Sequence, residues 1–594
     1  MLKTLLKSVR EYKAASILTP ILMVGEAVTE IIIPFFMTFI VGELERASKS
    51  VVPTSVDGKI IAIYASAMVA SALLALLFGV LGAKFAAKAS CGFAHNLRED
   101  MYNNLQTFSF ANIDNYSTSS LITRITTDVS NVQMAYQMSL RMLVRAPVLF
   151  ISSIIMTIII EPYIAMIFGG AAVVLGIVVV ICMLKVVPYF KTMFKKYDDL
   201  NSVVQENLTA IRVVKSYVRA DRENSKMRQA SEDVYKYSVK AERILTIMMP
   251  MVMFVLFICN IIILTVGSNM FVGNIPGNVS PSQIQTLIQY SAQILTGVMM
   301  AAMCLNFISL SKGSADRICE VLNETTTLPK PAEPVFEVKD GSVIFNDVDF
   351  CYSQKADVMV LKDITIRINS GETVGIIGAT GSGKTSLVSL IPRLYDVAQG
   401  SVEVGGVNVK DYNLDALRNS VAMVLQKNVL FSGTIAENLR WGDENATDED
   451  IRIACRQACA EEFIERLPGK YEYDLGQGGV NVSGGQKQRL CIARAMLKKP
   501  KVIIFDDSTS AVDTKTDADI RAALKMHAPE TTKIIIAQRI ASVQDADKII
   551  VLDDGRINGV GTHDELMASN EIYREVYESQ VKGSAEETVK GGEE

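Results

Sequence analysis

Six long apolar stretches occupy the first half of the chain, and a charged, strand-rich pattern occupies the second half. Most of these stretches are long enough to cross a bilayer core as helices, which takes roughly 20 residues. Buried helices of soluble proteins rarely run so far without a charge. We therefore predict six transmembrane helices, at about residues 14–41, 60–82, 143–160, 164–187, 244–271 and 284–310.

The connections between these stretches differ in length and charge. Residues 161–163 and 272–282 form two short connections without Lys or Arg, whereas the connections after the second and fourth stretches each exceed 50 residues and are rich in both. The positive-inside tendency places the long connections and both termini in the cytoplasm. Because the long connections have helical patterning, we expect the membrane helices to continue into the cytoplasm. We expect them to turn around in short helices near residues 115–120 and 209–214.

Two carboxylates, Glu26 and Glu30, lie one helical turn apart inside the first apolar stretch. A charged carboxylate in lipid is costly, so both should face protein or a water-filled cavity. One interpretation is a cation or proton site in a translocation path. The other is a polar pair that seals helices together or lies near the outer headgroups, and the sequence leaves both open.

Prolines mark the end of the apolar half. Pro329, Pro331 and Pro334 follow a charged helix that reaches Asn323, and they stop helical structure. From Val335 onward, short β-branched runs alternate with helical segments. This alternation predicts an α/β domain with a covered, partly parallel sheet.

The strongest motif follows the strand-like run Thr373–Ile377. Its glycine-rich residues are Gly378, Ala379, Thr380, Gly381, Ser382, Gly383, Lys384 and Thr385, with Ser386 next in the helix. Glycines let backbone amides point at phosphates, and the following helix adds its dipole. In such a P-loop, Lys384 reaches the β- and γ-phosphates, and the Thr385 hydroxyl binds Mg²⁺. The motif predicts nucleoside triphosphate binding but does not say what the nucleotide drives.

Two further motifs complete the nucleotide chemistry. Asp506 ends the apolar strand Val502–Phe505, which places its carboxylate on the magnesium side of the phosphates. Ser483, Gly484, Gly485 and Gln486 precede a predicted helix at Gln488–Met496 and form a second amide nest for an anion. A single site does not need two nests. The economical interpretation is that the second nest caps the γ-phosphate of a nucleotide bound to another cassette.

These motifs together resemble the ATP-binding-cassette exporters, in particular bacterial multidrug half-transporters, over about residues 10–580. The resemblance implies that Tyr352 stacks on adenine, and that Gln426 links Mg²⁺ and the attacking water to the membrane domain. It implies that Ser508–Asp513 touches the opposite cassette. It also implies that the two cytoplasmic turn helices are coupling helices.

The predicted fold class is therefore a six-helix, all-α membrane domain with long cytoplasmic extensions, followed by an α/β P-loop NTPase cassette. The predicted domains are a membrane domain at residues 1–328, a linker at 329–334, a nucleotide-binding domain at 335–582 and an acidic tail at 583–594.

Two residues depart from the family pattern at the position of catalysis. Asp507 stands where the family has a glutamate general base, and loss of one methylene withdraws the carboxylate by about 1.5 Å. Gln538 stands where the family has a switch histidine, and none of the chain's three histidines fits that role. A softer departure is Gln477-Gly478, where the family usually has Glu-Arg. We take Asp507, Gln538 and Gln426 as the catalytic set, and Thr385, Gln426 and Asp506 as the Mg²⁺ ligands.

An impaired site beside an intact Ser483–Gln486 loop resembles one subunit of a bacterial heterodimeric exporter. The prediction is an ATP-driven translocase in the cell membrane that binds ATP and Mg²⁺, exports apolar or amphipathic substrates and pairs with a different half-transporter. The alternatives are a slow homodimer whose site has drifted, a homodimeric lipid or peptide exporter, and an ATP-gated regulatory membrane protein.

Composition adds two expectations. The 594 residues include 59 Lys and Arg against 64 Asp and Glu, a net charge of −5, so no basic excess points to a nucleic-acid partner. The nine cysteines are scattered, and Cys455 and Cys459 lack a second pair or a nearby histidine to complete a zinc set. We expect reduced, packed thiols.

Overall fold

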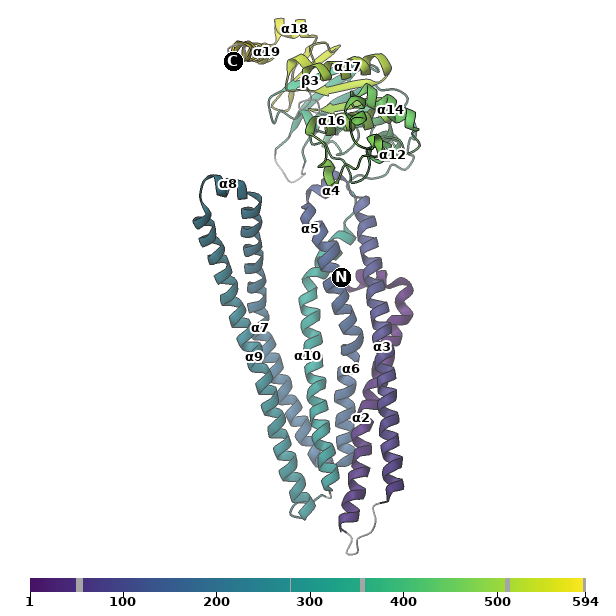
Figure 1. Cartoon of the computed structure of the whole chain (residues 1–594), viewed down its shortest axis with the longest axis vertical. Coiled ribbons are helices and arrows are strands. Elements are labelled where there is room, and N and C mark those ends of the chain that lie inside the picture. Colours follow the sequence, from purple (N-terminus) through teal and green to yellow (C-terminus); the bar gives the residue numbers. More distant parts are fainter. Residues whose placement is uncertain (50–56, 278, 353–357, 508–512, 591–594) are drawn as a thin grey trace. The chain divides into compact units, whose positions relative to one another are not determined.

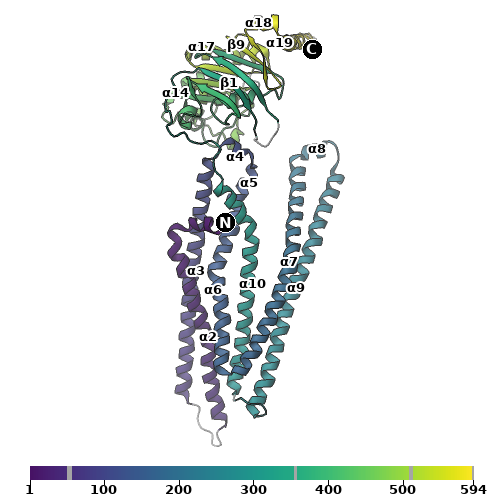
Figure 2. The same ribbon diagram turned by 180° about the vertical axis from the view of Figure 1, so that it is seen from behind.

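The computed structural model describes residues 1–49, 57–277, 279–352, 358–507 and 513–590. The chain forms two compact units (Figures 1 and 2). The helical unit comprises Met1–Gln106 and Thr118–Glu324, and the α/β unit comprises Thr107–Ser117 and Thr325–Glu594. The division at Glu324 falls just before the predicted linker, whereas the assignment of Thr107–Ser117 to the α/β unit was not predicted.

Within the described residues, six helical segments are long and apolar enough to span a membrane, which confirms the predicted number. They are Leu2–Ser48, Gly58–Gln106, Thr118–Ile160, Pro162–Thr209, Pro250–Val272 and Pro281–Asn323. The helices of this unit are α1 (Leu2–Leu5), η1 (Leu6–Tyr12), α2 (Lys13–Lys49), α3 (Gly58–Gln106), α5 (Thr118–Thr123), the π-helical turn η2 (Arg124–Asp128), α6 (Val129–Ile160), α7 (Pro162–Thr209), α8 (Ile211–Ser216), α9 (Ala220–Val272) and α10 (Pro281–Asn323).

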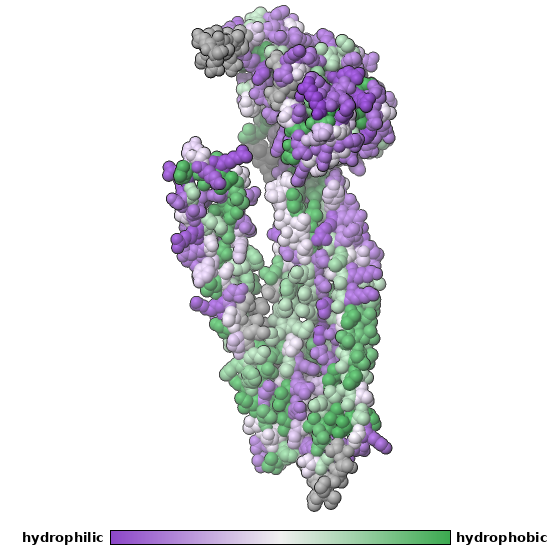
Figure 3. Space-filling model, in the orientation of Figure 1, coloured by the Kyte–Doolittle hydropathy of each residue, from purple (hydrophilic) through white to green (hydrophobic). Residues whose placement is uncertain are grey.

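The ends of these helices follow local sequence signals. Pro162 takes the first position of α7 directly after Glu161. A capping box between Ser280 and Gln283 starts α10, and Gly273 in the left-handed conformation ends α9. With 48 residues, α7 is about 72 Å long, more than twice the thickness of a bilayer core. Apolar side chains cover the lower part of the helical unit and polar ones gather on its upper part (Figure 3).

An ion-pair cluster joins α2 to α6 inside this unit. The Arg145 guanidinium lies 3.1 Å from a Glu26 oxygen and 2.7 Å from a Glu30 oxygen. The second Glu26 oxygen is buried without a hydrogen-bond partner among the described residues. Both carboxylates that the sequence singled out therefore contact one arginine from another helix. This contact supports the interpretation in which they hold helices together.

The helix pairs α2 and α3, α6 and α10, and α7 and α9 pack along their lengths. The last pair is joined by α8, close to the turn predicted at residues 209–214 (Figure 1). The other turn helix, α4 (Phe110–Asp114), ends before the predicted range of 115–120 begins. The Ser109–Asn112 capping box starts α4 early, and α5 resumes at Thr118.

Helix α4 belongs to the α/β unit through specific contacts. Asn112 donates to the Thr325 carbonyl at 3.0 Å, and its side-chain oxygen accepts from the Thr327 amide at 3.1 Å. The Tyr395 hydroxyl donates to Asp114 at 2.7 Å. These bonds tie a segment of the first half of the chain to the start and the body of the second half.

The α/β unit contains two sheets. A six-stranded sheet has the order β10-β9-β3-β8-β7-β6, in which β9, β3, β8, β7 and β6 are parallel and only β10 runs antiparallel. A four-stranded antiparallel sheet has the order β2-β1-β4-β5. The strands are β1 (Val343–Phe350), β2 (Leu361–Ile368), β3 (Thr373–Gly378), β4 (Gln399–Val404), β5 (Val407–Asn408), β6 (Val421–Val424), β7 (Val502–Asp506), β8 (Thr532–Ile536), β9 (Lys548–Asp553) and β10 (Arg556–Gly561). The partly parallel, covered sheet was predicted, and β3 and β7 match their predicted runs.

Each face of the six-stranded sheet carries its own core. Ile534 and Ile536 of β8 pack with the four-stranded sheet, whereas Ile535 packs with the helices on the opposite face. This alternation is the period of two expected when both faces of a strand are buried. The helices of the unit are α4, α11 (Lys384–Ser389), α12 (Leu414–Ser420), α13 (Ile435–Arg440), α14 (Asp448–Gln457), α15 (Glu461–Glu465), η3 (Lys470–Glu472), η4 (Gln477–Gly479), α16 (Gly484–Leu497), α17 (Thr514–His527), η5 (Ile540–Ser542), α18 (His563–Ser569) and α19 (Glu571–Lys590). All nine cysteines are free thiols, and burial raises the pKa of Cys455 to about 12.

Candidate active site

A cavity of about 630 Å³ opens where β3, β7 and β8 end. Ligand sites of parallel sheets lie at these carboxyl ends. The structure brings most of the predicted site residues together here. The lining includes Tyr352, Gly378, Ala379, Thr380, Gly381, Gly383, Lys384, Thr385, Ser386, Gln426, Asp506, Asp507 and Gln538, together with Val360, Ile377, Ile536, Asp553, Ile572 and Val576.

The P-loop runs from β3 to α11. A Cβ at Gly378 would lie 2.3 Å from the Leu552 carbonyl oxygen, so no larger residue fits there. Gly383 caps α11 with a φ of +95°, a left-handed conformation that glycine adopts without strain. The hydroxyl of Ser382 is buried without a hydrogen-bond partner among the described residues. The loop therefore presents backbone amides and one spare hydroxyl, as a phosphate cradle requires.

Lys384, Thr385 and Asp506 form the charged end of the cavity. Lys384 donates to the carbonyls of Gly378 and Ala379, at 2.8 Å each. Burial lowers the pKa of Lys384, and the nearby carboxylates partly offset this effect. The Thr385 hydroxyl donates to Asp506 at 2.9 Å. Neighbouring ligands of an octahedral Mg²⁺ lie about 3 Å apart, so this pair of oxygens fits the ion.

The predicted catalytic residues contact one another. One oxygen of Asp507 accepts hydrogen bonds from the Gln538 amide at 2.6 Å and from the Gln426 amide at 3.2 Å. Asp507 is buried and has a φ of +47°, which is uncommon for a residue with a side chain. Both departures from the family pattern therefore meet in one hydrogen bond.

The expected adenine platform lies at the rim of the cavity. The hydroxyls of Tyr352 and Ser386 share a hydrogen bond of 2.7 Å. The Tyr352 ring meets the Tyr395 ring edge-on, with centroids 5.1 Å apart, and Phe350 packs against both rings. Burial and the hydrogen bond to Asp114 raise the pKa of Tyr395. Tyr352 is 45 % exposed, so its ring is accessible to a base.

The residues Ser483 to Gln486 do not line this cavity. They start α16 with a capping box in which Ser483 and Gln486 each accept from the other's backbone amide. A Cβ at Gly484 would meet nothing within 4 Å. Within the described residues, therefore, no neighbouring atom requires a glycine there. Of the segment Ser508–Asp513, residues 508–512 lie outside the described residues, and Asp513 caps α17.

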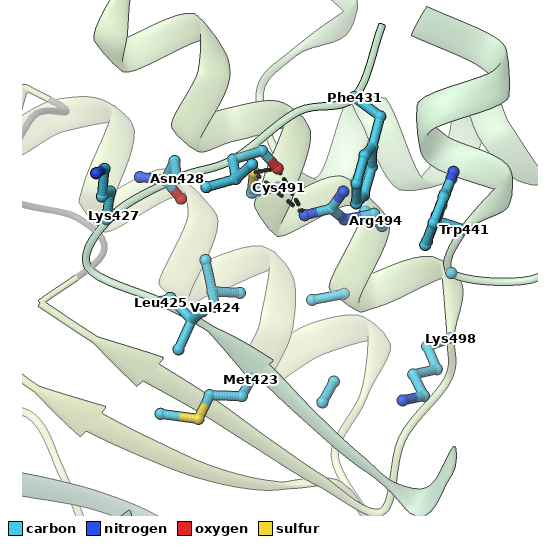
Figure 4. A pocket seen from close by; sticks show the side chains of 14 residues that line it. Met423, Val424, Leu425, Lys427, Asn428, Phe431, Trp441, Cys491, Arg494 and Lys498 are labelled. Atoms are coloured by element: carbon cyan, nitrogen blue, oxygen red, sulfur yellow. Dashed lines mark hydrogen bonds between the residues drawn. The ribbon is translucent and has the colours of Figure 1, made fainter. Parts of the chain in front are cut away.

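A groove of about 330 Å³ lies on the α/β unit between β6, α13 and α16. The rings of Phe431 and Trp441 stack at one side of it, with centroids 4.1 Å apart and 13° between their planes (Figure 4). Arg494 lies beside these rings, and Lys498 lines another part of the groove (Figure 4). Trp441 is 64 % exposed, which is unusual for so large an apolar side chain.

Sequence reasoning missed six residues that line the cavity, which are Val360, Ile377, Ile536, Asp553, Ile572 and Val576. Asp553 ends β9, whereas Ile572 and Val576 belong to the C-terminal helix α19. No motif marks these two residues of α19. Strand β9 is the sixth strand after β3 along the chain but lies beside β3 in the sheet, so the place of Asp553 at the cavity becomes clear only from the strand order.

Comparison with known proteins decides the family. The ABC transporter transmembrane region matches residues 16–299, and the ABC transporter family matches residues 361–510. The ABC transporter ATP-binding protein YfiB of Bacillus subtilis (strain 168) is 32% identical over 97% of this chain and 98% of its own length. The chain belongs to the ABC transporter family.

Two further likenesses refine the picture of this ABC transporter. YheI of Bacillus subtilis (strain 168), a probable multidrug resistance ABC transporter ATP-binding/permease protein, is 34% identical over 66% of each chain. The structure of a bacterial Atm1-family ABC exporter with ATP bound covers 96% of this chain and 98% of its own, with a TM-score of 0.82 and 22% identity. The chain therefore has the fold of an ABC exporter half-transporter, with one transmembrane region and one cassette. It is a multi-pass membrane protein whose cassette is an ATPase coupled to transport.

Proposed function

We propose that this ABC transporter is one subunit of a heterodimeric exporter whose own ATP site hydrolyses weakly. The observation that carries the proposal is the hydrogen bonding of Asp507. A general base needs a lone pair directed at the attacking water. Here one carboxylate oxygen accepts from both Gln538 and Gln426, and the neutral amide of Gln538 cannot exchange a proton as an imidazole does.

In this proposal, the residues that bind ATP and Mg²⁺ are intact. Lys384 and the P-loop amides hold the phosphates, Thr385 and Asp506 hold Mg²⁺, which neutralises phosphate charge, and Tyr352 stacks on the adenine. The support is their convergence on one cavity, with the Thr385 and Asp506 oxygens 2.9 Å apart. The site is therefore suited to hold nucleotide between two cassettes more than to turn it over.

The loop from Ser483 to Gln486 would complete the partner's site. It lies outside this chain's cavity, begins a helix of 14 residues and has open space at Gly484. Backbone amides at a helix N-terminus favour an anion. A phosphate held by another cassette could bind at this helix N-terminus without any change in this chain's fold.

The groove beside Phe431 and Trp441 supports the proposal that this chain binds a partner subunit. Exposed stacked aromatic rings flanked by Arg494 are the residue types that form anchors in interfaces. We assign it to a turn helix of the partner's membrane domain. In return, α8, which has no buried residue, would dock on the partner's cassette through Ile211 and Val213, which are exposed.

The proposed substrates are apolar or amphipathic small molecules moved out across the cell membrane, with the termini and the cassette in the cytoplasm. The multidrug name of YheI and the lack of basic residues in the short connections support these assignments.

Co-purification tests the proposal. A tagged chain, expressed in its native host, should bring down a second half-transporter that has Glu and His at the positions of Asp507 and Gln538. The assembled pair should show substrate-stimulated ATPase and uphill transport in vesicles. Asp507→Asn should reduce turnover less than about twofold, compared with the 10²- to 10⁴-fold loss typical of a lost base.

A chain that forms a fully active dimer by itself would refute the heterodimer. ATPase without uphill transport would favour an ATP-gated regulator. The control variant is Lys384→Ala, which should remove nucleotide binding at this site whichever function is correct.

A further inference from the structure

The C-terminal helix α19 forms part of the wall of the ATP cavity. Ile572 and Val576 line it from one side. The helix is anchored by Tyr573, which is fully buried and whose hydroxyl lies 2.8 Å from Nδ1 of His563. Asn570 accepts from the Tyr573 amide at 2.9 Å. These contacts fix the first turns of α19 against the α/β unit.

Two turns farther along α19, the side chain of Gln580 binds the segment that follows β8. Its oxygen accepts from the Ile540 amide at 2.9 Å, and its nitrogen donates to the Gln538 carbonyl at 2.7 Å. Gln538 lies beyond the end of β8 and Ile540 is the first residue of η5, so the Gln538 carbonyl has no ladder partner and the Ile540 amide has no partner within the helix. A carboxamide offers a donor and an acceptor in one plane and pairs with both groups at once.

The same residue, Gln538, is held on its other side by Asp507. Its side-chain amide donates to that carboxylate at 2.6 Å and lines the phosphate end of the cavity with Lys384. The contacts therefore form a continuous chain from α19 through Gln580 and the Gln538 backbone to the Gln538 side chain. A displacement of α19 would move the Gln538 amide relative to a bound phosphate.

We infer that Gln580 is a positioning residue that couples the C-terminal helix to the switch position, so that α19 helps this site to distinguish ATP from ADP. The inference rests on the proposed function, in which Lys384 holds the phosphates in the cavity that Gln538 also lines. Gln580 is not among the residues that line the cavity. Its two side-chain hydrogen bonds are to backbone groups of the segment after β8. Its effect passes through Gln538.

The test is equilibrium binding of ATP and of ADP to the purified full chain. Gln580→Glu keeps the shape of the side chain but places a carboxylate oxygen against the Gln538 carbonyl, which breaks one bond and adds repulsion. The preference for ATP over ADP should fall about five- to tenfold, as expected when a hydrogen bond of about 1 kcal/mol is lost and replaced by repulsion. Gln538→Ala should cause a similar fall.

Ser579→Ala is the matched control, because Ser579 is the exposed neighbour of Gln580 and should keep the wild-type ratio. Thermal unfolding of each variant separates positioning from folding. A purely structural role would weaken ATP and ADP equally and lower the Tm.

The outcomes are distinct. A normal ratio in Gln580→Glu with a reduced ratio in Gln538→Ala overturns the inference and leaves the proposed function intact. A normal ratio in both variants also overturns the inference, and the co-purification experiment tests the proposed function separately. Gln580→Met provides a second variant of similar volume, and if it and Gln580→Glu both fail to fold, Gln580 serves the fold and the inference is wrong.

Discussion

Gly484 is the position where a single substitution best separates the fold of this chain from its role at a partner's nucleotide. It is the first residue of α16, and a Cβ there would meet nothing within 4 Å. Gly484→Asp should therefore leave the cassette folded and stop ATP turnover by the assembled transporter.

The effect on folding can be worked out from the helix. Replacing glycine by aspartate in a helix gains about 0.3 kcal/mol in propensity, and a carboxylate in the first turn gains about 0.3–1 kcal/mol from the helix dipole. The added Cβ lies in open space among the described residues. The Tm of the full chain should stay unchanged or rise slightly.

The effect on turnover has the opposite sign. A carboxylate within about 4 Å of one phosphate charge costs about 4 kcal/mol at an effective dielectric constant of about 20. That cost corresponds to roughly a 10³-fold loss, and more for a γ-phosphate with two charges. Added bulk in the nest acts in the same direction.

The assay is steady-state ATPase of the co-purified pair in lipid nanodiscs, with thermal unfolding of the same samples. Gly484→Asn supplies the volume without the charge and Gly484→Ala only a Cβ, so activity should fall in the order Ala, Asn, Asp. The reasoning fails if Gly484→Asp keeps more than about a tenth of the activity, or if its Tm drops by several degrees.

Three other predictions concern the helical unit, the aromatic cluster and the P-loop lysine. Arg145→Met should lower the Tm more than Glu30→Gln does, because it leaves both carboxylates without their cationic partner, whereas Glu30→Gln keeps the pair between Arg145 and Glu26; equal losses would contradict this. Tyr395→Phe removes the hydroxyl that is bonded to Asp114 but keeps the ring beside Tyr352, so ATP binding should persist while substrate stimulation of the ATPase falls. Asp114→Ala should give the same loss. Full stimulation in both variants would refute a role of this hydrogen bond in coupling α4 to the ATP site. Only protonated Lys384 attracts phosphate, and burial lowers the pKa of Lys384, so ATP affinity should fall as the pH rises, before the pH reaches the ordinary lysine value of 10.5. Lys384→Arg should remove that fall. A constant ATP affinity up to pH 10.5 would contradict the prediction.

The architecture could be predicted from the sequence because its signals are long or chemically specific. Apolar runs of membrane-spanning length predict spans without any knowledge of packing. The P-loop and the strand that ends at Asp506 combine a local pattern with a required geometry. The substitutions at Asp507 and Gln538 were visible against the family pattern.

What the sequence could not predict depends on contacts between distant segments. Nothing in the first apolar stretch indicates that Arg145, more than 100 residues later, pairs with its carboxylates. The hydrogen bond between Asp507 and Gln538 joins residues that are 31 positions apart and that follow the neighbouring strands β7 and β8. The early start of α4 follows from a capping box with Asn112 at its third position, a weaker signal than the Glu or Gln usually found there.

The membership of Thr107–Ser117 in the α/β unit has a consequence for synthesis. This segment leaves the ribosome roughly 200 residues before the rest of its unit begins to emerge, a delay on the order of 10–40 s at about 5–20 residues per second. During that interval, Phe110 and Ile113 have not yet met the rest of the α/β unit, and each is 41 % exposed even in the finished fold. Dividing the gene at the prolines after Leu328 would therefore place α4 on one polypeptide and the surface that binds it on another.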